Sequence, residues 1–230
     1  MAAPKLLLTN DDGIDSVGLH RLAEVMQEIG EVTIVAPDAE YSGASASIGP
    51  LHLGGSIARR ATVPSGQTAW TVNGPPGLCV LFARMGAFDF TPDLVVSGIN
   101  PGANMGRAVY HSGTVGAALT GRNGNVPGIA VSQAFASFPE LDPDDPPSEE
   151  ELRAMYAAVI EKQNWDSAAA VAVEVVSGML EDLPPDCGVL NLNVPNLPVE
   201  EMNGFRWTSI NNPTYTKNCL LYTSPSPRDS

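Results

Sequence analysis

The stretch KLLLTNDDGID, Lys5 to Asp15, decides the fold of this chain. Its apolar run from Lys5 to Thr9 ends at a turn signal, which is typical of a strand buried on both faces of a parallel sheet. Two adjacent carboxylates, Asp11 and Asp12, then stand beside a glycine. Like charges at this spacing repel each other unless a cation lies between them. The stretch therefore predicts a first strand with a cation site at its end.

Helical and strand patterns alternate after this stretch. Apolar residues recur at three- and four-residue steps between Val17 and Ile29, and Gly30 follows as a C-cap, so we expect a helix there. EVTIVAP, Glu31 to Pro37, has the pattern of a second strand closed by proline. A strand, a helix and a strand in this order open a doubly wound sheet.

The alternation continues through the rest of the chain. We expect strands at residues 69–74, 93–100, 128–133 and 188–195, and helices from residue 76, at 114–122 and within 149–183. The last helical region is interrupted near Asn164 and Trp165, and we expect Asp166 or Ser167 to cap the helix that follows. These elements predict an α/β fold with a parallel sheet.

The length and charge of the chain limit its class. With 230 residues, 43% of them hydrophobic, we expect one domain with one sizeable core. The 26 acidic residues outnumber the 12 basic ones and give a formal net charge of -14, which argues against binding to nucleic acid. A small phosphorylated substrate is still allowed, because backbone amides and a bound metal act locally. We interpret the acidic, proline-rich run 138–151 as a solvated surface insertion.

The cysteines and the N-terminus indicate a cytoplasmic protein. Cys79, Cys187 and Cys219 are far apart and show no CxxC spacing, which is typical of a reduced, intracellular chain. The N-terminal apolar run is too short for a signal peptide, and no segment has the length of a membrane span. We expect no association with a membrane.

Three polar loops follow predicted strands, where ligands of open α/β sheets bind. They are TNDDG, YSGASAS (Tyr41 to Ser47) and SGINPGANMG (Ser97 to Gly106). Asp11 and Asp12, the Ser42 hydroxyl and the Asn100 amide oxygen suit Mg²⁺ or Mn²⁺, which prefer oxygen ligands. Each has an ordinary alternative: an Asp-Asp-Gly turn, a loop hydroxyl, and an asparagine bonded to its own loop.

A phosphate site is predicted next to these loops. Gly102 and Gly106 allow backbone amides to approach an anion, and Ser112 to Thr114 stand where a helix begins. The alternative is that Ser112 or Thr114 only caps the helix. His111 and Arg107 lie in the same region, but a single histidine or arginine there is equally explained by local bonding. Neither a Walker A motif nor GxGxxG occurs in the chain.

Five motifs in order closely resemble the SurE (survival protein E) family of metal-dependent nucleotidases. They are LLLTNDDGID, VTIVAPDAEYSGASASI, DLVVSGINPGANMG, YHSGTVGAALTGR and LNLNVPNLP, and the resemblance covers residues 5–198. It implies a Rossmann-like three-layer sandwich with a mostly parallel central sheet. It also implies a homodimer or homotetramer, and a 5′-nucleotidase that removes phosphate from nucleoside monophosphates with one divalent metal ion, Mg²⁺ or Mn²⁺.

The resemblance also assigns residues. The metal ligands of the family match Asp11, Asp12, Ser42 and Asn100, and the two aspartates are the catalytic candidates. Backbone and polar groups of the same motifs are candidates for holding phosphate: Asn10, Gly43, Gly102, Ser112, Gly113 and Thr114. The chain departs from the family with GPPGLC where GTPADC is common and with Ala108 where an acidic residue is frequent, which leaves its substrate preference open.

The expected mechanism is metal-assisted hydrolysis of a phosphomonoester by water, with either aspartate as the base. Activity on 3′-nucleotides, polyphosphate or another small ester is an open alternative. A different class is a non-catalytic nucleotide- or metal-binding protein, or an inactive fragment. The same loops would then capture phosphate without turnover.

The end of the chain has a separate interpretation. CLLYTSPSPRD, Cys219 to Asp229, matches the translation of a transposon-end adapter used in sequencing libraries. We therefore expect a nucleotidase domain at residues 1–218 that is incomplete at its C-terminus, followed by an artefactual disordered tail at 219–230. An ordinary Pro/Ser-rich disordered tail is the alternative.

Overall fold

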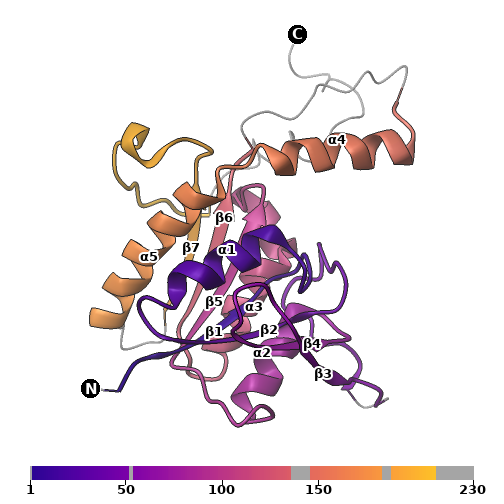
Figure 1. Ribbon diagram of the computed structural model, residues 1–230, viewed down its shortest axis with the longest axis vertical. Helices are drawn as coiled ribbons and strands as arrows, with labels where there is room; N and C mark the ends of the chain where they lie inside the picture. Colours follow the sequence, from indigo (N-terminus) through magenta and orange to yellow (C-terminus); the bar gives the residue numbers. More distant parts are fainter. Residues whose placement is uncertain (1, 52–53, 136–145, 183–187, 211–230) are drawn as a thin grey trace.

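A seven-stranded sheet forms the centre of the computed structural model, which describes residues 2–51, 54–135, 146–182 and 188–210 (Figure 1). The strands are β1 (Lys5–Thr9), β2 (Glu31–Pro37), β3 (Ala58–Ala61), β4 (Thr68–Val72), β5 (Leu94–Pro101), β6 (Gly128–Gln133) and β7 (Val189–Val194). Their order in the sheet is β3-β4-β2-β1-β5-β6-β7. Only β3 pairs antiparallel with its neighbour, so the predicted mostly parallel sheet is confirmed.

The strand order creates a switch point between β1 and β5. From β1 the chain adds β2 and β4 on one side, and then returns to add β5, β6 and β7 on the other side. Loops that leave β1 and β5 at their carboxyl ends therefore run in opposite directions. In doubly wound sheets the crevice between such loops binds the ligand.

Helices cover both faces of the sheet (Figure 1). They are α1 (Val17–Met26), α2 (Pro76–Arg84), α3 (Gly113–Arg122), α4 (Glu149–Glu161) and α5 (Trp165–Glu181). Leu6 and Leu8 pack in one core with residues of α1 and α5, whereas Leu7 packs in a second core with residues of α2. This split follows from the alternation of side chains along β1. The predicted three-layer sandwich is confirmed.

Some element boundaries differ from the sequence expectation. The helix expected to reach Ile29 ends at Met26, where Gly30 N–H bonds to the Met26 carbonyl and closes a turn. The N-cap of α5 is Asn164, whose side chain accepts from Ser167 N–H, so the expected cap at Asp166 or Ser167 was wrong. Asp166 instead pairs with Arg21 of α1.

Helix α4 forms an arm that extends beyond the sheet (Figure 1). Val159 is the only buried residue of this helix. A capping box begins it, because Ser148 and Glu151 each bond the backbone N–H of the other. The arm is therefore stabilised mainly at its two ends.

Parts of the expected organisation lie outside the described residues. These are most of the expected surface insertion, residues 138–145, and the boundary at 218 with the tail that follows it. In the described ranges, no helix combines the length and apolar character that a membrane crossing requires.

Candidate active site

Asp11 is the most enclosed of the predicted metal ligands. It follows β1, and its residue is only 3% exposed. Thr114 Oγ1 donates a 2.6 Å hydrogen bond to Asp11 Oδ1, and the backbone amides of Gly113 and Thr114 also favour the charged carboxylate. Burial outweighs these bonds and raises the pKa of Asp11 above its ordinary value. The start of α3 therefore holds this carboxylate in place.

Asp12 has an unpaired oxygen. Its Oδ2 is buried and has no hydrogen-bond partner among the described residues. Burial and, to a smaller extent, the nearby charges of Asp11 and Glu40 together raise the pKa of Asp12 to about 8. An isolated buried carboxylate is costly unless a positive charge neutralises it. The donor set thus fits a divalent cation beside Asp11 and Asp12.

Asn10 shapes the turn that presents the two aspartates. Its Nδ2 donates to the Gly13 carbonyl at 3.0 Å and to Ser16 Oγ at 2.7 Å, and Ser16 caps α1. Asn10 Oδ1 is buried and finds no partner in the described ranges. The amide hydrogens of Asn10 thus bond atoms of the turn itself. Its role in binding phosphate remains a prediction.

The loop after β2 is joined to Asp11 through the backbone. Tyr41 N–H donates to the Asp11 carbonyl at 2.7 Å. The next residue, Ser42, is exposed, and its hydroxyl donates to Glu40 Oε1 at 2.9 Å. Gly43 has φ +83°, a conformation that glycine adopts readily. Ser42 and Gly43 therefore follow directly after the residue that is bonded to the Asp11 backbone.

The same loop is fixed against α3 and the short 3₁₀ helix Gly106–His111 before it, which the sequence did not predict. Ser45 N–H donates to the His111 carbonyl at 3.2 Å, and Ser45 Oγ donates to the Tyr110 carbonyl at 2.8 Å. A Cβ at Gly116 would lie 2.0 Å from the Ser45 carbonyl oxygen. This glycine in α3 is therefore required for the close approach of the loop.

Asn100 lies near the end of β5, across the switch point from Asp11. Its Nδ2 donates to the Gly102 carbonyl at 2.7 Å, so the amide bonds its own loop, as the simpler interpretation expected. Asn100 Oδ1 accepts no hydrogen bond within the described parts of the chain. The oxygen is the atom a hard cation prefers. The bond of Asn100 Nδ2 to its own loop and the binding of a metal ion by Asn100 Oδ1 are therefore compatible.

An asparagine cluster that the sequence analysis missed holds the loop after β5. Asn104 N–H donates to Asn193 Oδ1 at 2.8 Å, and Asn193 Nδ2 returns a bond to the Asn104 carbonyl at 3.1 Å. Asn191 Nδ2 donates to the same carbonyl, and Asn104 Nδ2 donates to Ser132 Oγ. The motif LNLNVP contains both β7 asparagines, but their partner could not be seen from the sequence.

Ser112 is the N-cap of α3. Its hydroxyl accepts from Val115 N–H at 3.1 Å, as the capping alternative expected. Gly113 packs so closely on Asp11 that a Cβ there would lie 2.7 Å from Asp11 Oδ2. Gly113 and Thr114 are thus placed at the acidic pair, while the capping bond engages Ser112. Their contacts with phosphate remain predictions.

The predicted metal ligands belong to three chemical types: carboxylate, hydroxyl and amide. Nowhere in the described ranges do three His, Cys, Asp or Glu side chains gather in a metal-binding arrangement. Two carboxylates with a hydroxyl and an amide oxygen still suit Mg²⁺ or Mn²⁺, which retain several waters. A site built from thiolates and imidazoles, as zinc prefers, does not fit these residues.

The strand order and the Asp11–Asp12 pair after β1 define a Rossmann-like α/β protein with a buried acidic pair at its switch point. Comparison with known proteins then gives the family. The model of the family described as Survival protein SurE matches residues 6–217. The chain belongs to the SurE family, and the resemblance found in the sequence is confirmed.

Relatives with assigned names support this membership. The chain is 38% identical over 224 residues to 5′-nucleotidase SurE of Stenotrophomonas maltophilia (strain K279a), covering 96% of this chain and 75% of the relative. It is 36% identical over 214 residues to 5′-nucleotidase SurE of Coxiella burnetii (strain Dugway 5J108-111), covering 91% and 70%. The crystal structure of the SurE protein from Aquifex aeolicus is similar with a TM-score of 0.68 and 33% identity, over 88% of this chain and 71% of that one.

Proposed function

We propose that this chain is a 5′-nucleotidase that removes phosphate from nucleoside monophosphates with the help of one divalent metal ion, Mg²⁺ or Mn²⁺. Family membership and the names of the relatives support the nucleotidase class. The observation that carries the metal dependence is the buried Asp12 Oδ2 next to Asp11, which has no hydrogen-bond partner among the residues that the structure describes. We further propose a cytoplasmic enzyme that forms a homodimer or homotetramer.

Asp11, Asp12, Ser42 and Asn100 would hold the metal ion. When bound, the ion offsets the charge of the phosphate and lowers the pKa of a coordinated water. Asp11 is a fixed ligand, because Thr114 and the α3 amides hold it. Asp12 Oδ2 has no partner in the described structure, so we propose that this oxygen accepts the proton of the attacking water. We thus propose Asp12 as the base and Asp11 as a metal ligand only.

The remaining candidates orient the phosphate. Gly43 and Gly102 both have positive φ angles, which turn their backbone away from ordinary strand geometry. We propose that amides of these loops and the Ser112–Thr114 segment bind the phosphate oxygens, with Asn10 keeping the turn in shape. Water then attacks phosphorus, the P–O bond to the nucleoside breaks, and the nucleoside oxygen takes a proton.

The test is a panel of 5′- and 3′-nucleoside monophosphates and a short polyphosphate, with phosphate release measured before and after EDTA. We expect release from 5′-nucleotides with Mg²⁺ or Mn²⁺ and none after EDTA. The variants Asp11→Asn and Asp12→Asn are expected to lose this activity while their circular dichroism spectra stay unchanged. Full activity in both variants would refute the roles of the aspartates.

The panel also separates the alternatives. Binding of nucleotide without release of phosphate would support a non-catalytic binding protein. Release from polyphosphate or 3′-nucleotides alone would replace the 5′-nucleotidase assignment by one of the open alternatives. Size-exclusion chromatography with light scattering measures the expected homodimer or homotetramer.

A further inference from the structure

Phe135 lies at the carboxyl edge of the sheet beside the candidate metal site. It follows β6 by two residues, and its ring packs on Gly102, where a Cβ would lie 3.0 Å from Phe135 Cε2. The Gly102 carbonyl accepts the bond from Asn100 Nδ2. Gly102 therefore links the Phe135 ring to Asn100, a candidate metal ligand.

Tyr156 of the α4 arm meets this ring. The ring centroids of Phe135 and Tyr156 are 6.2 Å apart at an interplanar angle of 81°, an edge-on arrangement. Tyr156 is 40% exposed, although Val159, on the same face of α4, is buried. A large aromatic side chain thus faces the body of the molecule and keeps part of its surface open to solvent.

The charges of the candidate site also affect the pKa of Tyr156. Burial raises the pKa of Tyr156, and the charges of Asp12, Glu40 and Asp11 raise it further. Such an effect requires the phenol to lie within electrostatic range of the acidic pair. The aromatic pair and the candidate metal site therefore share one region of the surface.

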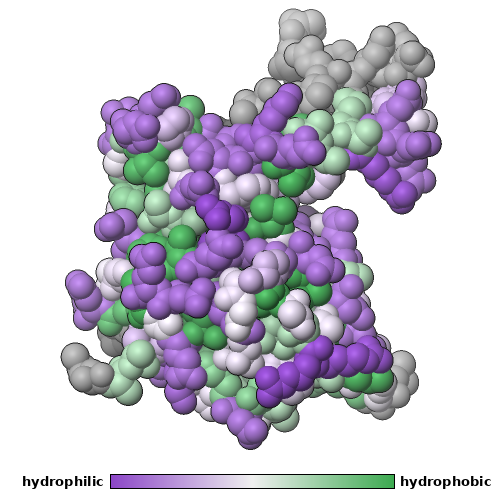
Figure 2. Space-filling model, in the orientation of Figure 1, coloured by the Kyte–Doolittle hydropathy of each residue, from purple (hydrophilic) through white to green (hydrophobic). Residues whose placement is uncertain are grey.

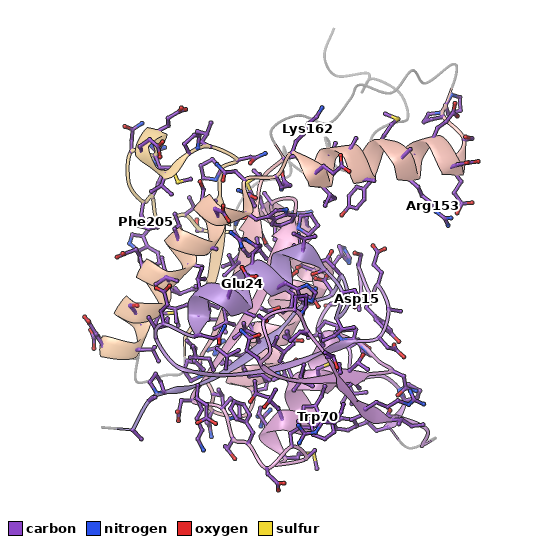
Figure 3. The ribbon with its side chains drawn as sticks, in the orientation of Figure 1. Asp15, Glu24, Trp70, Arg153, Lys162 and Phe205 are labelled. Carbon is purple, nitrogen blue, oxygen red and sulfur yellow. The ribbon has the colours of Figure 1, made fainter. Side chains whose placement is uncertain are left out.

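A polar junction fixes the arm in this position. Asn164 N–H donates to Asn196 Oδ1 at 2.7 Å, and Gln133 Nε2 donates to the Asn164 carbonyl at 2.6 Å. Gln133 is the last residue of β6, so the junction ties the end of α4 to the strand that leads to Phe135. Figure 3 marks the two ends of the arm with Arg153 and Lys162 and shows Asp15 on the body below it.

The space under the arm is accessible. Figure 2 shows an open notch between the arm with α4 and the body of the molecule. Tyr156 of α4 contacts Phe135 of the body and is 40% exposed, so a flat group bound between α4 and the body would meet the open part of this ring. Nucleobases are flat, and all of them have a π-face that stacks on aromatic side chains.

We propose that Phe135 and Tyr156 form the nucleobase subsite of this chain, in which the base of a nucleoside monophosphate stacks on Tyr156 and Phe135 holds that ring in place. The proposal rests on the proposed function and adds the side chains that bind the non-reacting part of the substrate. Stacking requires no hydrogen bond to the edge of the base, so the subsite accepts bases of different kinds.

The test compares AMP with ribose 5-phosphate, which has the same phosphate ester but no base. We expect Tyr156→Ala to raise KM for AMP roughly tenfold, within the range for loss of one base–aromatic stack. KM for ribose 5-phosphate is expected to stay unchanged. Tyr156→Phe retains the ring and is expected to behave as wild type. Phe135→Leu is expected to raise KM for AMP as well, by a smaller factor.

Leu152→Ala is the matched control. Leu152 lies one turn from Tyr156 on α4 and is also 40% exposed, but it is not part of the aromatic pair. We expect this variant to keep both KM values. An equal change for the two substrates in Tyr156→Ala, or no change for AMP, would overturn the proposal.

Calorimetry separates this inference from the proposed function. Binding of AMP and of inorganic phosphate is titrated with Mn²⁺ present, so that no turnover is needed. Weaker binding of AMP by Tyr156→Ala, with phosphate binding unchanged, would support the subsite even if wild type released no phosphate. Equal binding of AMP by wild type and Tyr156→Ala, or no binding by either, would refute it.

Discussion

Thr114 Oγ1 lies 2.6 Å from Asp11 Oδ1, across 103 residues of sequence. The bond joins the first turn of α3 to the end of β1, on opposite sides of the switch point. Both residues are almost fully buried. A buried hydrogen bond to a charged group fixes geometry more strongly than an exposed one, so the orientation of Asp11 depends on α3.

The first prediction concerns this hydroxyl. Thr114→Val keeps the shape of the side chain but leaves Asp11 Oδ1 without its donor, at a cost of about 1–3 kcal/mol in the free energy of unfolding. Loss of a group that orients a metal ligand typically lowers metal affinity roughly 10- to 100-fold. Chemical denaturation and Mn²⁺ titration measure the two effects. Thr114→Ser, which retains the hydroxyl, is expected to bind Mn²⁺ nearly as wild type does; an equal loss in both variants would contradict the role of the bond.

The second prediction concerns Gly113. A methyl group there would lie 2.7 Å from Asp11 Cβ and Oδ2, so Gly113→Ala must displace the carboxylate. We expect a loss of about 1–3 kcal/mol in stability and roughly a 100-fold loss of nucleotide turnover, because misplacement by about 1 Å has effects of this size. Denaturation and phosphate release measure both. Turnover at the wild-type rate would show that Asp11 tolerates the displacement.

Gly178 provides the matched control for this substitution. It is an exposed residue of α5, and a Cβ there would meet no atom within 4 Å. Gly178→Ala is therefore expected to raise the free energy of unfolding by about 0.5–1 kcal/mol, as alanine in place of glycine does inside a helix. Its turnover is expected to equal that of wild type.

The third prediction concerns the asparagine cluster. Asn193→Ala removes two hydrogen bonds to the backbone of Asn104, whereas Asn191→Ala removes one. At about 0.5–1.5 kcal/mol per bond, we expect Asn193→Ala to be roughly twice as destabilising. It is also expected to lower kcat more, because it leaves the Asn104 N–H near the Gly102 turn without its acceptor, whereas Asn191→Ala leaves both Asn193 bonds in place. Equal effects of the two variants on kcat would indicate that the loop does not depend on Asn193.

The fourth prediction concerns pH and the arm. Hydrogen bonds from the Ser148 side chain and backbone lower the pKa of Glu151 below its ordinary value of 4.5. A lowered pKa means that this contribution is complete above the ordinary value and is lost as the pH falls through the lowered one. We expect hydrogen exchange in the first turn of α4, corrected for intrinsic rates, to keep its protection above pH 4.5 and to lose it as the pH falls further, through the lowered pKa of Glu151. Glu151→Gln keeps the capping geometry without a titrating group, so its protection is expected to vary little over this range.

The location of the candidate site, at the end of β1, could be predicted because its signals are local. The apolar run of β1, the Asp11–Gly13 turn and the order of elements together indicate which loops meet at the switch point. The strand β3 was missed because its sequence, ARRA, is short, polar and partly exposed, and its contacts with β4, including Arg60 over the Trp70 ring, are tertiary. Propensity and periodicity hold no signal for such an edge strand.

Contacts between distant elements could not be predicted from the sequence. The bonds of Asn104 with Asn193 and the ring contact of Phe135 with Tyr156 depend on how β7 and α4 pack beside the loops. Each residue by itself has an ordinary local explanation. Their role depends on tertiary packing, which one sequence without its fold does not specify.

The bond from Tyr41 N–H to the Asp11 carbonyl uses main-chain atoms alone. Every amino acid except proline provides the same N–H group, so a substitution at position 41 by any residue other than proline retains the donor of this hydrogen bond. Among randomly mutated genes selected for function, this bond by itself would exclude only proline at position 41. The link between the Asp11 turn and the loop that carries Ser42 is thus independent of the side chain at position 41.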